Sequence, residues 1–335
     1  MYATIALVAF AISLLVTPLS IKLGQRYGFV DRPGGRRQHQ GEVSRLGGLA
    51  LFTAFVGTGG LVFGLSAVGW WEPIGPEDRK LLTGVLVGSI FMFGVGLWDD
   101  LKELSPGRQY AAQFVAALIA IFFDIIFQRV TLPVLGQTDF PWWITYPLTV
   151  FWVTGMINTV NWLDGLDGLA AGVAAIAGLL FAIHAYSLGQ TTVALFPLAL
   201  AAACLGFLPF NFFPARVFMG GGSMLLGYAL ASLSILAPAK VATALLVLGI
   251  PIIDVAWIII RRWRRGQPTR AGRDHLHHRL LDVGLSQRQI VLLYYTFCAT
   301  FGMLALVIEV RLFKLMALLV LGILTLFVLW RLSRT

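Results

Sequence analysis

Four aspartates stand in two pairs at the ends of apolar runs. Asp99 and Asp100 directly follow one run, and Asp164 and Asp167 directly precede another. Carboxylates that gather at one surface repel each other unless a cation lies among them, and oxygen-rich sites of this kind suit Mg²⁺, which shares ligands with substrate phosphates. Capping of helix starts is the alternative role of such aspartates. Two pairs in separate connections favour a cation site.

A glycine run in a later connection could bind phosphate. Gly220-Gly221-Gly222 precedes Ser223 and a further apolar run. Backbone N–H groups at such a helix start can hold a phosphate, although glycine runs also form plain turns. Phe218, two residues before the run, could stack on a nucleobase or lie at a membrane interface.

A basic segment beyond residue 260 provides donors for a diphosphate. It contains His275, His277, His278 and Arg279. Guanidinium groups bind phosphate oxygens in pairs, and these histidines lack the companion acids of a zinc-protease pattern, so we expect phosphate contact rather than zinc. Asp254 lies inside a neighbouring apolar run, where an acid is either functional or paired with another helix.

The elements that position these residues are membrane-spanning helices. The chain has 335 residues, of which 58% are hydrophobic and 12% are charged. A soluble domain carries roughly 25% charged residues, and about twenty apolar residues cross the hydrocarbon layer as a helix. We therefore predict an all-α, polytopic transmembrane bundle with a single domain over residues 1–335. The eleven predicted spans are 2–22, 46–66, 81–98, 109–127, 143–158, 168–187, 190–208, 223–237, 239–260, 289–308 and 312–331.

The distribution of basic residues predicts the orientation. With the N-terminus outside and the C-terminus in the cytoplasm, nineteen of the 25 Lys and Arg residues lie on the inner side. This is the asymmetry of the positive-inside rule, and the same charge attracts membrane lipids. We expect no nucleic-acid partner, because no basic soluble domain is evident. Cys204 and Cys298 lie in apolar runs without metal-ligand spacing and are interpreted as small hydrophobic residues.

The predicted orientation places five polar connections near one membrane face. They combine carboxylates, amides, imidazoles and guanidiniums. The residues concerned are Asp31, Pro33, Arg36, Arg37, His39 and Arg45 in the first connection, Asp99 and Asp100 in the second, Asn158, Asn161, Asp164 and Asp167 in the third, Asn211, Arg216, Phe218 and Gly220–Gly222 in the fourth, and Asp274–Arg279 in the fifth.

These motifs resemble those of the polyprenyl-phosphate N-acetylhexosamine-1-phosphate transferases, the superfamily of MraY, WecA and TagO. Asp99-Asp100 resembles the DD motif of that family. The run from Asn158 to Gly168 is similar to NxxNxxDGxDG, and the run from Asn211 to Phe218 is similar to NFxPARxF. The His275-Leu-His277-His278-Arg279-Leu run resembles the WecA and TagO branch. The resemblance covers nearly the whole chain.

The resemblance implies transfer of N-acetylhexosamine-1-phosphate, with GlcNAc as the expected sugar, from a UDP-N-acetylhexosamine to polyprenyl (undecaprenyl) phosphate, with release of UMP. It implies Mg²⁺ as cofactor, with Mn²⁺ as the alternative ion, a bacterial inner membrane with a cytoplasmic active site, and a homodimer as a further partner state. The implied catalytic residues are Asp99, Asp100, Asp164 and Asp167. The implied metal ligands are Asn161, Asp99 and Asp100. The implied substrate-binding residues are Arg45, Asn158, Asn161, Asn211, Phe218, Gly221, His275, His277, His278 and Arg279.

Two positions depart from the family pattern. The family has GDxGS before the eighth span, with its Asp on Mg²⁺, whereas Gly220-Gly221-Gly222-Ser223 is one residue shorter and lacks an Asp. Gln109, beside Arg108, stands where the family has Lys. The first departure supports an alternative function, a catalytically impaired or non-catalytic binder of polyprenyl phosphate or UDP-sugar. A transporter is a third hypothesis, although the polar residues cluster at one face rather than at the midplane.

Overall fold

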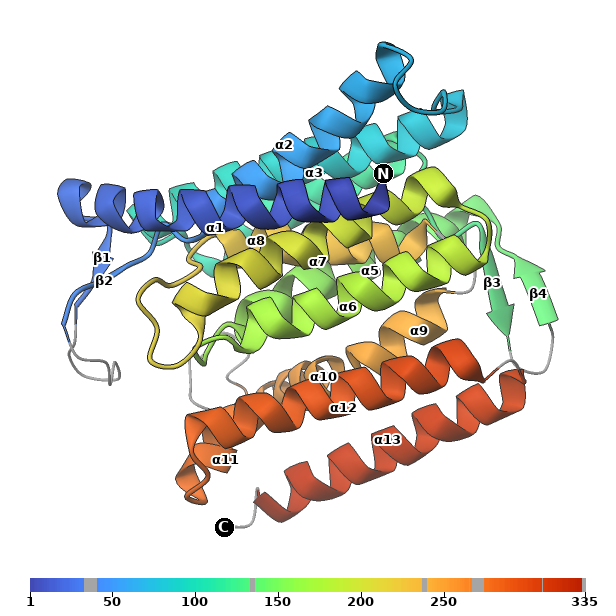
Figure 1. Ribbon diagram of the computed structural model, residues 1–335. Helices are drawn as coiled ribbons and strands as arrows, with labels where there is room; N and C mark the ends of the chain where they lie inside the picture. The colour runs from blue at the N-terminus through green and yellow to red at the C-terminus, as the bar shows by residue number, and fades with distance from the viewer. Residues whose placement is uncertain are drawn as a thin grey trace.

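The computed structural model describes residues 1–32, 41–132, 136–236, 240–264, 266, 274–308 and 310–332. These residues form a bundle of helices with two short antiparallel hairpins (Figure 1). The helices are α1 (Tyr2–Tyr27), α2 (Gly48–Ala67), α3 (Pro76–Lys102), α4 (Pro106–Phe122), α5 (Trp142–Leu163), α6 (Leu169–Ser187), α7 (Thr191–Asn211), α8 (Gly222–Ile235), α9 (Lys240–Val247), α10 (Gly249–Arg264), α11 (Leu276–Asp282), α12 (Gln287–Val307) and α13 (Arg311–Leu332). The hairpins pair β1 (Val30–Asp31) with β2 (Val43–Ser44), and β3 (Arg129–Leu132) with β4 (Gly136–Asp139).

The predicted class, an all-α membrane protein, is confirmed. Every predicted span overlaps a helix, although α4 ends at Phe122, before the end of the span predicted over 109–127, and within the described residues seven helices are long and apolar enough to cross a membrane. They are α1, α2, α3, α6, α7, α12 and α13. The count of eleven spans and the orientation stay predictions.

The ninth predicted span, 239–260, is not one continuous helix, and whether it crosses a membrane stays a prediction. The structure divides it at Leu248 into α9 and α10. Pro251 explains the break, because proline has no N–H to donate to the carbonyl four residues earlier, and its ring crowds that carbonyl. Gly249, which is a poor helix former, adds to the effect.

Several polar residues that we expected in connections belong to the last turns of helices. α3 continues through Asp99 and Asp100, and α5 continues through Asn158 and Asn161. The predicted boundaries followed the end of the apolar residues, but a helix can extend into the polar layer because water satisfies its last carbonyls there. These side chains are therefore placed by helical geometry rather than by loops.

α8 is the central helix of the bundle. Every residue from Gly222 to Ser234 is buried, and α3 and α5 pack closely along it. Close packing on α3 requires small residues, since a Cβ on Gly88 would lie 1.9 Å from the Tyr228 ring and a Cβ on Gly96 would lie 2.4 Å from the Gly221 carbonyl oxygen. The contact brings the polar end of α3 against the start of α8.

The polar connections gather at one end of the bundle. Figure 1 shows the β1–β2 hairpin, the α7–α8 connection and α11 at the left end, opposite the N-terminus and the β3–β4 hairpin. Exposed tryptophans mark both ends, with Trp70 and Trp142 far from the polar connections and Trp98 and Trp263 near them. Tryptophan favours membrane–water interfaces, so this distribution agrees with a bundle that spans a membrane.

Candidate active site

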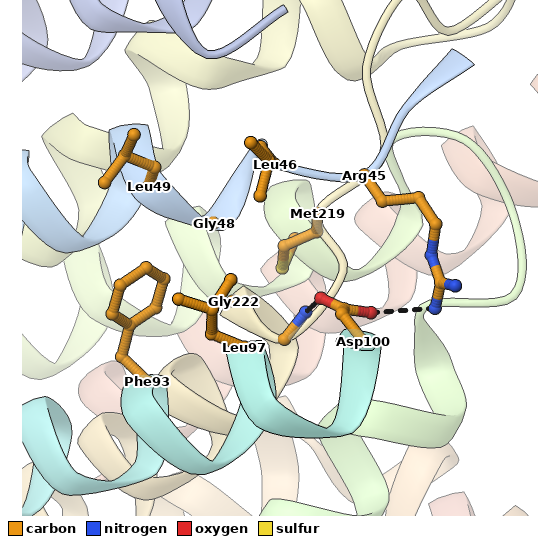
Figure 2. Close-up of a pocket in the computed structure, with 10 residues that line it drawn as sticks. Arg45, Leu46, Gly48, Leu49, Phe93, Leu97, Asp100, Met219 and Gly222 are labelled. Carbon is orange, nitrogen blue, oxygen red and sulfur yellow. Dashed lines mark hydrogen bonds and ion pairs between the residues drawn. The ribbon is translucent and has the colours of Figure 1, made fainter. Parts of the chain in front are cut away.

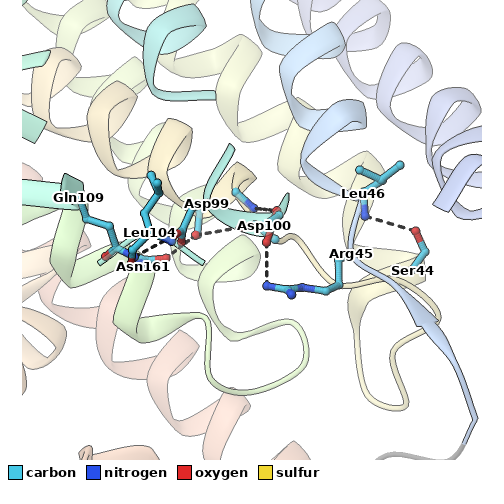
Figure 3. Close-up of polar contacts among 11 residues, drawn as sticks. Ser44, Arg45, Leu46, Asp99, Asp100, Leu104, Gln109 and Asn161 are labelled. Atoms are coloured by element: carbon cyan, nitrogen blue, oxygen red, sulfur yellow. Dashed lines mark hydrogen bonds and ion pairs between the residues drawn. The ribbon is translucent and has the colours of Figure 1, made fainter. Parts of the chain in front are cut away.

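Asp100 joins three segments that are distant in the sequence. The guanidinium of Arg45 donates to Asp100 Oδ1 at 2.7 Å, and the backbone N–H of Gly221 donates to Oδ2 at 2.6 Å. Figure 3 shows Asp100 turned toward Arg45 at the end of α3. The Asp100 side chain is 8% exposed and that of Arg45 is 32% exposed. Asp100 therefore connects the first, second and fourth polar connections through two short hydrogen bonds.

A narrow pocket lies beside this ion pair (Figure 2). Its polar end is formed by Arg45 and Asp100, and the remainder is glycine backbone and apolar side chains. The other lining residues are Leu46, Gly48, Leu49, Phe93, Leu97, Met219, Gly221 and Gly222. The Arg45–Asp100 pair thus stands at the boundary between the polar end of the bundle and its apolar interior.

Backbone hydrogen bonds fix the position of Arg45. Phe218 N–H donates to the Ser44 carbonyl at 2.8 Å, and Gly47 N–H donates back to the Phe218 carbonyl at 3.0 Å. Gly47 must be glycine, because a Cβ there would lie 2.5 Å from the Phe218 carbonyl oxygen. The first connection is therefore held directly against the fourth, and Arg45 points from this contact to Asp100.

Asp99 has different partners from its neighbour. Its Oδ1 accepts from Leu104 N–H at 2.8 Å and from Gln109 Nε2 at 3.0 Å. Gln109, the residue at the family's Lys position, therefore binds an aspartate of the DD pair directly (Figure 3). Capping within the turn after α3 accounts for part of the role of Asp99.

The third and fourth connections also contact each other. Asp167 Oδ2 accepts from Ala215 N–H at 2.9 Å, and Asn211 accepts from Gly168 N–H at 3.1 Å while donating to the Val217 carbonyl at 2.9 Å. Asn211 is buried, so its amide holds the two loops together. The structure thus brings the predicted residues of four connections together.

Two asparagines on α5 have separate partners. Ser223 donates to Asn161 Oδ1 at 2.8 Å, which ties the end of α5 to the start of α8. Asn158 exchanges two hydrogen bonds with Gln113 of α4, at 2.7 and 3.2 Å, and also donates to the Thr154 carbonyl at 2.8 Å. Both N–H groups of the Asn158 amide are therefore used within the protein.

We predict that Asn158 acts on activity by holding α5 against α4. Asn158→Ala and Gln113→Ala should each lower turnover by a similar factor, about 3- to 10-fold, because each leaves a buried amide unpaired at a cost of ~1 kcal/mol. The double variant should lose no more than either single variant. Turnover and the Michaelis constant for the sugar nucleotide would be measured for all three. Additive losses, or a higher Michaelis constant for Asn158→Ala alone, would instead support direct substrate contact.

The His275–Arg279 segment forms the start of α11. His275 and His277 are buried and their rings are stacked, with centroids 5.4 Å apart, whereas His278 is half-buried. Arg279 is 8% exposed, and its guanidinium donates to the Asp274 carbonyl at 2.8 Å and to the Leu329 carbonyl of α13 at 3.5 Å. Arg279 therefore has a packing role besides the predicted phosphate contact.

The electrostatics of the site come from crowded acids on one side and a buried imidazole on the other. Burial raises the pKa of Asp164 well above its usual range, and the negative charges of Asp100 and Asp167 raise it further. Burial lowers the pKa of His277 well below its usual range, and His278 and His275 lower it further. His277 is therefore a neutral imidazole at pH 7.

The donor set fits a cation that also binds substrate phosphate. Within the described residues, the Asp164 side chain makes no hydrogen bond, its backbone N–H donates to the Val160 carbonyl at 3.2 Å, and no three acid, imidazole or thiol side chains surround one point. Mg²⁺ typically uses one or two carboxylates, several waters and substrate oxygens, and a cation here would relieve the repulsion of Asp164 by Asp100 and Asp167. Asp164 thus joins Asn161, Asp99 and Asp100 as a ligand candidate.

Some functional candidates were missed from the sequence. Gln113 looked like an ordinary span residue, and Trp162 of the third connection was given no role, yet Gln113 pairs with Asn158 and Trp162 lies edge-on to His275 at 5.5 Å between ring centroids. An amide inside an apolar run is the signal that could have identified Gln113. Pro33, Arg36, Arg37 and His39 of the first connection lie outside the described residues.

Comparisons with known proteins find relatives over most of the chain. The model of glycosyl transferase family 4 matches residues 82–238. The chain is 36% identical over 314 residues to a probable undecaprenyl-phosphate N-acetylglucosaminyl 1-phosphate transferase of Bacillus subtilis, covering 90% of this chain and 84% of that protein. It is 32% identical to the decaprenyl-phosphate N-acetylglucosaminephosphotransferase of Mycobacterium tuberculosis, covering 88% and 79%. It is 33% identical to the undecaprenyl-phosphate alpha-N-acetylglucosaminyl 1-phosphate transferase of Haemophilus influenzae, covering 88% and 83%.

Proposed function

The chain belongs to the polyprenyl-phosphate N-acetylhexosamine-1-phosphate transferase superfamily, and we propose from this premise that it transfers GlcNAc-1-phosphate from UDP-GlcNAc to a polyprenyl phosphate. The products are UMP and a lipid-diphospho-sugar. We also propose that the protein lies in a bacterial inner membrane, that residues 1–335 form a single domain, and that the reaction takes place at the cytoplasmic face. The homodimer stays a prediction.

The observation that carries this proposal is the position of Asp100. Its carboxylate lies between Arg45 and the Gly221 N–H, so residues of three polar connections meet at one group. The negative charges of Asp100 and Asp167 both act on Asp164, which joins these acids electrostatically. Acids, an arginine and a glycine-rich helix start are the groups that diphosphate chemistry needs. Among the described residues, these contacts gather at one end of the bundle, which counts against a transport pathway through the midplane.

The residues then take the following roles in the proposal. Arg45 would bind an acceptor phosphate, and Asp100 beside it would orient or deprotonate that phosphate. Asn161 and Asp164 would hold Mg²⁺, whose chemistry when bound is to neutralise charge on the diphosphate and on departing UMP. Phe218 and Asp167, from adjoining loops, would face the nucleoside. His277, as a neutral imidazole, would bind the sugar or a phosphate oxygen.

The test is a UMP-release assay with purified protein. UDP-GlcNAc, undecaprenyl phosphate and Mg²⁺ are combined, and UMP and the lipid product are both measured. Lipid-dependent release of UMP, abolished by EDTA and restored by Mg²⁺, is the expected result. Tight binding of UDP-GlcNAc without any UMP release would instead establish the non-catalytic alternative.

The proposed orientation has its own test. Gly107, at the polar end of α4, and Gly75, at the opposite end before α3, are exposed, and both have open space for a side chain. In intact cells, an impermeant thiol reagent should label a Gly75→Cys variant and not a Gly107→Cys variant. Cys204 and Cys298 are buried and give little background. The reverse labelling pattern would place the site outside the cell.

A further inference from the structure

Asp254 is an acid buried within the bundle that the reaction proposed above does not use. It lies on α10, is 3% exposed, and follows Pro251 by less than one turn. A carboxylate in this position is costly unless both of its oxygens are paired. Its partners therefore indicate what the residue does.

Both oxygens of Asp254 hold the beginning of α11. Oδ2 lies 3.0 Å from His275 Nδ1, and Oδ1 accepts from Leu276 N–H at 2.9 Å. Because a carboxylate oxygen accepts hydrogen bonds, we assign the proton of this pair to Nδ1 of His275. His275 is the N-cap residue of α11, and its own side chain does not cap the helix. Asp254 thus sets both the tautomer of His275 and the start of the helix.

By holding His275 and the start of α11, Asp254 also affects the position of His277. The ring of His277 lies nearly parallel to that of His275, at an interplanar angle of 8°. Trp162 packs edge-on against the same His275 ring. His277 is 1% exposed, and neither ring nitrogen has a hydrogen-bond partner among the described residues. A Cβ on Gly165 would lie 2.4 Å from His277 Nε2, so this nitrogen faces the loop of Asp164 and Asp167. Buried unpaired nitrogens of this kind call for a ligand.

We propose that Asp254 is a positioning residue for the transfer reaction, which fixes the ring of His275 and the start of α11 and thereby directs His277 at the loop of Asp164 and Asp167. The proposal rests on the proposed function for its reaction. It does not make Asp254 a catalytic residue, since among the described residues the hydrogen bonds of its carboxylate go to His275 and to the backbone N–H of Leu276.

The decisive variant is Asp254→Asn, which keeps the size of the side chain. Its single oxygen can still accept from Leu276 N–H, but its NH₂ group then faces His275 Nδ1 and forces the proton to Nε2. We expect turnover to fall at least about tenfold, as for other lost orienting partners of functional histidines. Asp282→Asn, the same change at an exposed position on α11, should leave turnover unchanged. The double variant Asp254→Asn with His275→Asn should be no worse than His275→Asn alone.

A readout independent of turnover separates positioning from stability. The protein has 5 histidines, so ¹⁵N-histidine NMR of the full-length protein in detergent can resolve their ring nitrogens. We expect a proton on Nδ1 of His275 in the native protein and its transfer to Nε2 in Asp254→Asn. Unchanged ring signals, or a lower melting temperature with normal turnover of the folded fraction, would overturn the proposal. A native protein that shows this Nδ1 proton but releases no UMP would refute the proposed function. The hydrogen bond of Asp254 to His275 would still stand.

Discussion

Replacing Asp100 with Asn should lower the turnover of the transferase by about 100-fold, equal to ~2.7 kcal/mol at the transition state. The carboxylate accepts from Arg45 with one oxygen and from Gly221 N–H with the other. An amide has one acceptor and one donor, so in either orientation its NH₂ group faces another donor. The unpaired group costs roughly 1–3 kcal/mol, and the negative charge next to Arg45 is lost as well.

Asp124→Asn is the matched control for this change. Asp124 follows α4 at the opposite end of the bundle, where it is exposed and pairs with Lys80. Its backbone φ is 60°, a conformation that Asn tolerates, and exposed ion pairs contribute about 0–1 kcal/mol. Initial rates of UMP release, with protein amount checked by fluorescence-detected gel filtration, would compare the two. Full activity of Asp100→Asn would show that Asp100 serves only as a structural cap at the start of α8.

Hydropathy predicted the helices of this protein well because the signal is long and local. Each run of about twenty apolar residues has only one low-energy state in lipid, which is a helix. The break at Leu248 was also readable in principle, since Pro251 removes one backbone donor. The short β1–β2 hairpin was not predicted, because two-residue strands carry no periodic pattern and their pairing depends on the contact with residues 217–219.

The residues of the candidate site could be predicted from their types, but their pairings could not. Asp99 and Asp100 are adjacent and chemically identical in the sequence. In the structure Asp99 accepts a hydrogen bond from Gln109 and Asp100 accepts one from Arg45, because successive residues on a helix point in directions about 100° apart. Asp254 was identified as an intramembrane acid, but its partner His275 is 21 residues away and becomes a neighbour only through the fold.

The glycine run before α8 leads to the other large effect that we expect. Gly221 touches α3 backbone to backbone, since a Cβ there would lie 2.1 Å from the Gly96 carbonyl carbon. No rotamer relieves such a clash, so Gly221→Ala and Gly221→Asp should both abolish activity and lower the melting temperature. Gly107→Ala, at an open position in α4, should change neither. A folded and active Gly221→Asp would show that α3 can move away from α8.

Inserting one Asp between Gly220 and Gly221 should have the opposite result, an increase in turnover of at least about tenfold, or ~1.4 kcal/mol. The gain requires the turn at Gly220, which has a φ of 55°, to lengthen while Gly221 keeps its contact with Gly96, because a Cβ on Gly220 itself would lie 2.3 Å from the Arg45 carbonyl oxygen. The new carboxylate would then enter beside Asp100, where a cation is needed to offset the added charge, and EDTA should remove the gain. An Asn inserted at the same place has the same length without the charge, so it should gain nothing. Equal rates for the native protein and both insertions would show that the site works without this carboxylate, and equal gains for both insertions would assign the effect to the length of the turn.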